Sequence, residues 1–183
     1  MGKLQIIFVI ETSNDDKSDS LYLRAILDYY FLYENDIYDG EVATQTICLN
    51  GKQHYNDKKI VNRIVNQTKM FASQNPSSTT KVIYILDIDS TAKAFKQGSF
   101  FYNVIEFCNS NGFELVWYCK NAENVFLGQE ADKIENKTEA AISFVRNDNI
   151  RKIKKINLSK IDIEYKCSNI LNIIGKYLKQ KQK

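Results

Sequence analysis

The sequence has very few of the residues from which zinc sites and disulfide frameworks are built. It contains one histidine and four cysteines among 183 residues, and no two cysteines form a Cys-x-x-Cys pair. This argues against a zinc site and against a small secreted fold held together by disulfides. We expect the cysteines to be reduced, with Cys48 and Cys119 buried inside apolar strands.

Glycine and proline are also scarce. The seven glycines are scattered along the chain, and the single proline, Pro76, lies in the polar segment 74–80. None of the glycines forms the GxGxxG or GxxxxGKS/T pattern in which backbone amides cradle phosphates. The two common glycine-rich nucleotide-binding loops are therefore excluded.

No apolar run in the chain is long enough to cross a membrane, which takes about 20 residues. The first apolar stretch, Leu4–Ile10, is too short for a signal peptide and leads directly into polar residues. These absences predict a cytoplasmic protein without a membrane partner.

The net charge of only +3 does not by itself demand a nucleic-acid partner. The charge is uneven, however, because basic residues gather in two runs. These runs consist of Arg151, Lys152, Lys154 and Lys155, and of Lys176, Lys179, Lys181 and Lys183. Such runs are either solvated surface or contacts to phosphates.

Four segments rich in apolar and β-branched residues are predicted to be strands buried on both faces. They comprise residues 4–10, 42–49, 81–86 and 113–119. Amphipathic or capped segments between and after them predict helices over residues 20–33, 57–71, 100–109, 122–127, 137–144 and 162–178.

This alternation predicts an α/β fold with a mostly parallel central sheet of about four strands. We expect residues 1–120 to form the α/β core. Residues 121–183 would form a helical C-terminal extension packed on the same domain.

Carboxylates follow two of the predicted strands. Glu11 ends the first strand, and Asp87 and Asp89 end the third. Side chains two residues apart on an extended segment point to the same side, so Asp87 and Asp89 can converge while Ile88 turns into the core. Ligands bind beyond the carboxyl ends of strands in parallel sheets.

Three crowded carboxylates resist ionisation unless a cation lies among them. Mg²⁺, or Mn²⁺ in its place, is the hard cation that suits such a site. The alternative is that these acids start turns or cap helices, as aspartates after strands commonly do.

A glutamate at the end of the first strand, followed by Asp-x-Asp at the end of a later one, resembles the Toprim domain. That domain occurs in topoisomerases, bacterial primases, OLD-family nucleases and the RloB-like proteins of phage defence. The resemblance covers roughly residues 4–119 and implies a Toprim/Rossmann-like three-layer fold. It differs at Thr12, where the family usually has glycine, and at residues 90–92, where the family is often glycine-rich.

The resemblance implies a Mg²⁺-dependent phosphodiester hydrolase, a nuclease acting on DNA or RNA, with a role in phage defence. Asp87 and Asp89 would hold the metal, and Glu11 would serve as metal ligand or general acid/base. Segment 113–118 is similar to an RloB-type stretch, which adds Glu114 as a metal ligand. The basic residues that would contact backbone phosphates are Arg151, Lys152, Lys154 and Lys155.

Two other interpretations remain open. Residues 85–91 also resemble the first motif of haloacid dehalogenase-like phosphatases, in which Asp87 would be the nucleophile and Asp89 the acid/base. The chain could instead be a non-catalytic α/β module, flavodoxin-like or receiver-like, that binds a nucleotide or a partner. A protein partner or a homodimer is compatible with each interpretation.

Overall fold

The computed structural model describes residues 3–12, 16–32, 42–88, 96–129 and 131–182. Its centre is a four-stranded parallel sheet with the strand order β3-β1-β4-β5. The strands are β1 (Leu4–Ile10), β3 (Val42–Cys48), β4 (Thr79–Ile88) and β5 (Glu114–Cys119). The predicted α/β fold with a parallel sheet is confirmed.

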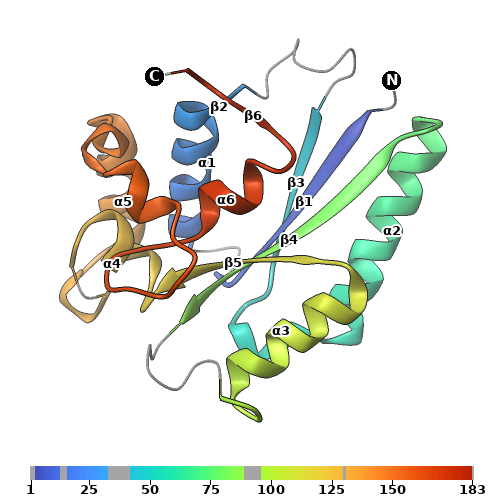
Figure 1. Ribbon diagram of the computed structural model, residues 1–183, viewed down its shortest axis with the longest axis horizontal. Helices are drawn as coiled ribbons and strands as arrows, with labels where there is room; N and C mark the ends of the chain where they lie inside the picture. The colour runs from blue at the N-terminus through green and yellow to red at the C-terminus, as the bar shows by residue number, and fades with distance from the viewer. Residues whose placement is uncertain (1–2, 13–15, 33–41, 89–95, 130, 183) are drawn as a thin grey trace.

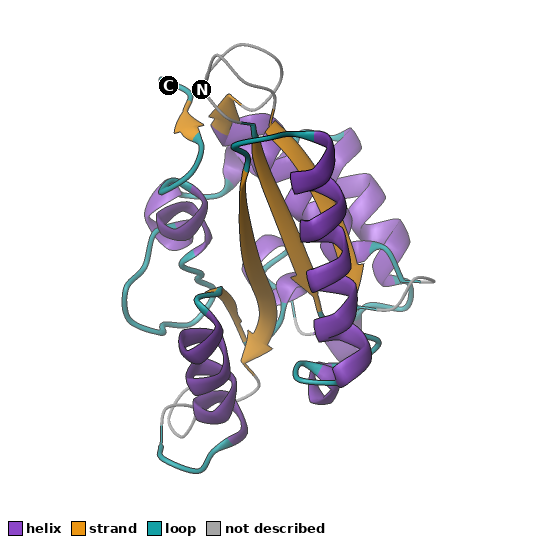
Figure 2. Cartoon of the chain, turned by 90° about the vertical axis from the view of Figure 1, so that its right-hand side faces the viewer, coloured by secondary structure: helices purple, strands orange, loops and turns teal. Residues whose placement is uncertain are grey.

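Helices cover both faces of this sheet, which makes three layers (Figure 1). One face carries α1 (Ser18–Tyr30), α4 (Ala122–Phe126), α5 (Lys137–Arg146) and α6 (Ile170–Ile174). The other carries α2 (Lys58–Gln74) and α3 (Phe100–Asn111). The layers are also visible from the side (Figure 2).

Several short elements lie between or after the main strands and helices along the chain. They comprise a small antiparallel pair, β2 (Phe31–Leu32) with β6 (Lys179–Gln180), and the 3₁₀ turns η1 (Lys52–His54), η2 (Ala131–Lys133), η3 (Asn149–Lys152) and η4 (Lys155–Leu158).

The strands are apolar on both faces because each face is buried. In β1, Ile6 and Phe8 pack among the residues of α1, whereas Ile7 and Val9 pack among those of α2 and α3. Alternate residues of a strand point to opposite faces, so continuous apolar composition is what a central parallel strand requires. Cys119 is buried and Cys48 partly buried, and all four cysteines are free thiols.

The chain leaves the carboxyl ends of β1 and β4 in opposite directions along the sheet. From β1 the chain crosses through α1 to β3, and from β4 it crosses through α3 to β5 on the opposite side. The two crossovers lie on opposite faces, so the order reverses between β1 and β4. A crevice opens at such a switch point, beyond the ends of the two strands.

The predicted helix over residues 162–178 is wrong for most of its length, because α6 covers only Ile170–Ile174. The preceding residues pair with the free edge of β5 instead. The amide of Cys119 donates to the carbonyl of Cys167 at 2.9 Å, and the amide of Trp117 donates to Asn169 Oδ1 at 3.0 Å. Unpaired strand groups that need partners outweigh the helical periodicity here.

Residues after β5 share one core with the sheet. Phe126 of α4 stacks on Tyr22 of α1 at 4.7 Å between ring centroids, and contacts Phe144 of α5 at 5.8 Å. Phe126 also meets Tyr118 of β5 edge-on at 5.3 Å. Within the described residues, no helix has the length and apolar composition needed to span a bilayer.

We expect Phe144→Ala to lower the free energy of unfolding by about 3–5 kcal/mol, because it opens a cavity in this shared core. Urea denaturation would be followed by Trp117 fluorescence, which reports on β5, and by circular dichroism, which reports on the helices. Both signals should shift together. Ile142→Ala on the same helix, where Ile142 is 41% exposed, is the control and should change stability by less than about 1 kcal/mol. Separate midpoints for the two signals would contradict a single cooperative core.

Candidate functional site

A cavity of about 290 Å³ lies at the carboxyl edge of the sheet, at the switch point between β1 and β4. Most of its lining is acidic or polar. The lining residues are Glu11, Thr12, Asp16, Ser18, Asp19, Asn50, Gly51, Asp87, Glu123 and Lys137. We call this space the acidic cavity.

The structure brings Glu11 and Asp87 together, as the sequence predicts. The register pairs Ile10 with Ile85, so Glu11, which follows β1, lies beside the last residues of β4, among them Asp87. The backbone amide of Asp87 donates a hydrogen bond of 3.1 Å to Glu11 Oε2. This bond holds one carboxylate oxygen of Glu11 beside the backbone of Asp87. Asp89 lies outside the described residues.

Three further acids, which the sequence analysis missed as site residues, line the acidic cavity: Asp16 and the buried residues Asp19 and Glu123. Asp19, in the first turn of α1, is 6% exposed, and Glu123, in the first turn of α4, is 3% exposed. Both helices start just beyond strand ends, which carries their first turns to the same edge. In the sequence, Asp19 and Glu123 could be recognised only as acids in the first turn of a helix that follows a strand. Such acids commonly serve only to interact favourably with the helix dipole, so they do not by themselves indicate a site.

Burial and mutual repulsion make these acids difficult to ionise. Burial, then the charges of Glu123, Glu11 and Asp16, raises the pKa of Asp19 from 3.8 to about 7, although Lys137 lowers it. Burial, followed by repulsion from the other acids of the cavity, also raises the pKa of Asp87 well above its usual range, and Lys52 only partly opposes this. A cation in the acidic cavity would remove this penalty.

Polar hydrogen-bonding groups also face the acids without partners among the described residues. The hydroxyl oxygens Thr12 Oγ1 and Ser18 Oγ are buried and make no hydrogen bond there. Both residues line the acidic cavity, and Ser18 is only 1% exposed. Since buried hydroxyls normally find partners, the cavity has capacity to hydrogen-bond a ligand or water.

The hard oxygen groups of the acidic cavity match the ligand preference of Mg²⁺. Among the described residues, no three histidine, cysteine or acidic side chains are placed to bind one ion directly. Mg²⁺ keeps several waters and is commonly held by only one or two carboxylates, so the chemistry of Glu11 and Asp87 fits such an ion.

Glu114 lies apart from the acidic cavity. It is the first residue of β5 and pairs in register with Ile83, whereas Asp87 pairs with Tyr118 four residues further on. Four residues of strand place Glu114 about 13 Å away, toward the opposite edge. Its carboxylate binds Lys176 Nζ at 2.8 Å and accepts from the Tyr177 hydroxyl, and these bonds lower its pKa against the opposing effect of burial. The structure therefore gives Glu114 a structural partner and does not group it with the predicted metal ligands.

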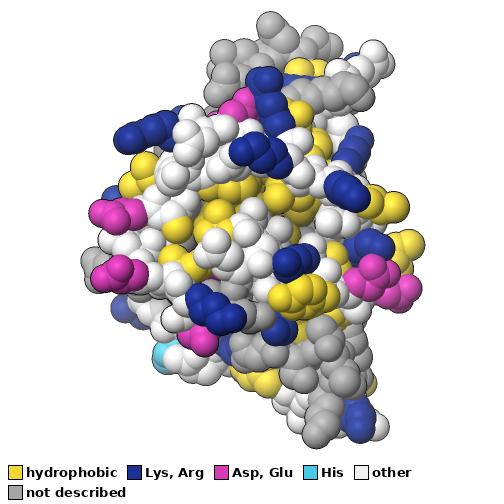
Figure 3. Space-filling model, turned by 90° about the vertical axis from the view of Figure 1, so that its left-hand side faces the viewer, with side chains coloured by type: hydrophobic (Ala, Val, Ile, Leu, Met, Phe, Trp, Pro, Cys, Tyr) yellow, Lys and Arg dark blue, Asp and Glu magenta, His cyan; other side chains and the backbone are white. Residues whose placement is uncertain are grey.

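The basic run is exposed at η3 and η4. Arg151 pairs with Asp148, and Lys152 and Lys154 line a separate pocket. Lys155 is exposed nearby. Figure 3 shows Lys and Arg side chains spread over the face at the left of Figure 1, with apolar groups between them.

In comparisons with known proteins, no family model matches the chain and no curated protein matches it in sequence. The resemblance to the Toprim domain stays a prediction. What the chain does must accordingly be argued from the acidic cavity itself.

We expect the stability of the protein to fall as the pH rises from about 4 to about 7. The pKa of Asp19 is near 7 in the folded protein and 3.8 in its ordinary state, so the folded state binds the extra proton between these values. Ionising Asp19 above that range opposes folding. Asp19→Asn should therefore raise the free energy of unfolding by about 2–4 kcal/mol at pH 8 and change it little at pH 4.

The measurement is urea denaturation at both pH values in the presence of EDTA. Asp28→Asn is the matched control, because Asp28 is on the same helix and its side chain is 48% exposed. An Asp19→Asn variant that is less stable than the wild type at pH 8 would show that the carboxylate is not under strain.

Proposed function

We propose that the protein is a Mg²⁺-dependent phosphodiester hydrolase, a nuclease acting on DNA or RNA, whose active site is the acidic cavity. Mn²⁺ would serve in place of Mg²⁺. The observation that carries this proposal is the convergence of Glu11 and Asp87 at the switch point of the sheet, held by the bond from the Asp87 amide to Glu11 Oε2.

The acids of the cavity favour a cationic ligand over a bare anion. Asp19 and Glu123 are almost fully buried, and both raise the pKa of Asp87. A phosphate alone would add negative charge to this cluster. A divalent cation relieves the repulsion and also supplies the charge that neutralises a phosphodiester and activates the attacking water.

In this mechanism Glu11 and Asp87 would hold the cation, and the sequence pattern would add Asp89 as a further ligand. The Asp87 amide holds Oε2 of Glu11 by a hydrogen bond. This contact also fixes the orientation of the other carboxylate oxygen, Oε1. Lys137, which lines the acidic cavity, is placed to pair with a substrate phosphate.

Asp19 is the candidate for proton transfer. Its pKa is about 7 without a cation, and a cation at Glu11 and Asp87 would lower it, so Asp19 would be ionised and could accept the proton of the attacking water. Its burial on α1 keeps it at a fixed position facing the other carboxylates. The buried Ser18 hydroxyl beside it can hydrogen-bond the attacking water or a phosphate oxygen.

The same geometry bears on the phosphatase alternative. That mechanism needs Asp87 as a nucleophile and gives Glu11 no role, yet Glu11 bonds directly to the Asp87 backbone. The raised pKa of Asp87 does not separate the two mechanisms, because a bound cation would restore the ionised carboxylate in either. The contact with Glu11 is what favours the metal-dependent hydrolase.

We expect Mg²⁺ to raise the melting temperature of the wild-type protein and to have no such effect on Asp87→Asn or Glu11→Gln. In EDTA at pH 8, Asp87→Asn should instead melt at a higher temperature than the wild type, because the fold can bury the Asp87 carboxyl only as a charge or with an added proton. These opposite signs separate the loss of a cation site from misfolding. Calorimetric titration with Mg²⁺ and Mn²⁺ measures the binding directly.

Cleavage of labelled single- and double-stranded DNA and RNA tests the activity, and we expect each variant to lose about 100-fold or more. Glu106→Gln, an exposed acid on α3, is the control and should keep both metal binding and cleavage. If neither Mg²⁺ nor Mn²⁺ binds the wild type, with or without nucleic acid, the proposed function is wrong.

A further inference from the structure

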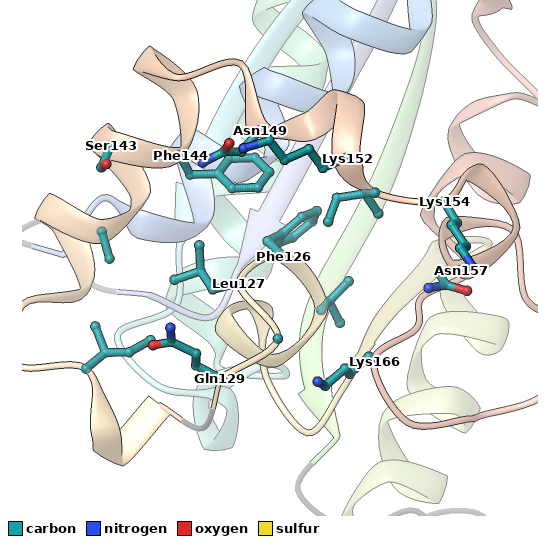
Figure 4. Close-up of a pocket in the computed structure, with 15 residues that line it drawn as sticks. Phe126, Leu127, Gln129, Ser143, Phe144, Asn149, Lys152, Lys154, Asn157 and Lys166 are labelled. Carbon is teal, nitrogen blue, oxygen red and sulfur yellow. The ribbon is translucent and has the colours of Figure 1, made fainter.

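A second, larger pocket opens on the face that carries α4 and α5. It has a volume of about 770 Å³, which lies within the usual range for small-molecule sites. Its walls come from α4, α5, η3, η4 and the residues around Lys166. Figure 4 shows Lys152, Lys154 and Lys166 at the margins of this pocket, around Phe126 and Leu127. We call it the lysine pocket.

The charge of the lysine pocket is opposite to that of the acidic cavity. Three lysines line it, and none of the described residues in its lining is an aspartate or a glutamate. The Lys166 ammonium lies beside Gly128, and a Cβ built at Gly128 would be only 3.2 Å from Lys166 Nζ, a tight contact. Gly128 thus leaves room for this ammonium at the pocket margin. A site of this charge selects an anion.

The pocket also has features suited to a flat, partly apolar group. Apolar residues of α4 and α5 form its floor together with Leu127, which follows α4, and Ile153, which follows η3, and both of these are partly exposed. Asn149 Oδ1 is a buried acceptor that has no hydrogen-bond partner among the described residues. It can accept from an amino group, and Asn157 and Gln129 add further polar groups.

The two sites are separated by one short helix. In α4, which has five residues, Glu123 lines the acidic cavity, whereas Val125 and Phe126 line the lysine pocket. Two to three residues of helix span only about 3–5 Å along the axis. The two pockets therefore share α4 as a common wall.

From these observations we propose that the lysine pocket binds a nucleotide unit. Its phosphate lies against Lys152, Lys154 and Lys166, and its base lies on the apolar floor with an amino group directed to Asn149 Oδ1. If the bound nucleotide belongs to a substrate strand, the inference rests on the proposed function. Binding of a nucleotide in the lysine pocket does not itself require a metal ion.

The test is calorimetric titration, in EDTA, of the full-length protein with AMP, ATP, and eight-nucleotide single strands of DNA and RNA. We expect micromolar to millimolar binding of at least one probe. The double variant Lys152→Gln/Lys166→Gln should weaken it at least about tenfold and reduce the dependence of affinity on salt. Lys58→Gln/Lys59→Gln makes the same charge change on the opposite face of the sheet and should bind as the wild type does.

Asn149→Leu tests the position of the base. It should weaken binding of AMP or the oligonucleotides but leave the binding of pyrophosphate unchanged. An equal loss for pyrophosphate would overturn the placement of the base. Preference for the oligonucleotides identifies a strand, and preference for AMP or ATP identifies a free nucleotide.

Absence of binding by every probe, or equal losses in the two double-lysine variants, would overturn the inference. Because the titrations contain EDTA, their outcome is independent of Mg²⁺ binding at Glu11 and Asp87. Nucleotide binding without Mg²⁺ binding would support the nucleotide site and contradict the proposed function. Mg²⁺ binding without nucleotide binding would support the proposed function and contradict the nucleotide site. Melting temperatures of all variants confirm that each is folded.

Discussion

Burial of β1 on both faces is the constraint on which the rest of the structure depends. Six of its seven residues are buried, and the helices on each side are what bury them. A strand buried in this way must have neighbours on both edges, and β3 and β4 supply them in parallel. Parallel pairing then gathers the carboxyl ends of the strands at one edge, where Glu11 and Asp87 meet.

The same arrangement explains why the acids at this edge are costly to the fold. The first turns of α1 and α4 bring Asp19 and Glu123 under cover together with the strand-end acids. With Asp16, five carboxylates line this small volume, and the nearby cations Lys52 and Lys137 offset their repulsion only in part. Proteins commonly give up stability in this manner where a site must hold a charged ligand.

Much of the sheet could be predicted from the sequence because its signal is local. Leu4–Ile10 reads as a buried strand because apolar composition on both faces is a property of the strand itself. The meeting of Glu11 with Asp87 followed from strand ends and parallel order. The positions of Asp19 and Glu123 could not be predicted in this way, because they depend on how two helices pack above the sheet. An acid near the start of a helix also has several common roles.

The C-terminal region shows a different limit. The apolar residues Ile163, Ile170 and Ile174 have helical spacing, yet the backbone before Ile170 satisfies the edge of β5. Periodicity records which side chains are buried but not which backbone groups elsewhere lack partners. For the same reason, Lys152 and Lys154 read as one run with Arg151 in the sequence, whereas the fold turns only the two lysines into the pocket wall.

The segment that pairs with β5 has a consequence for how this molecule meets other copies of itself. Cys167 and Asn169 occupy the hydrogen-bonding groups along one margin of the sheet. An open strand margin is a template on which another chain can add a strand. Truncation of the chain before residue 167 would expose the edge of β5 to other copies of the protein. The C-terminal segment therefore protects the sheet against aggregation in addition to forming part of the core.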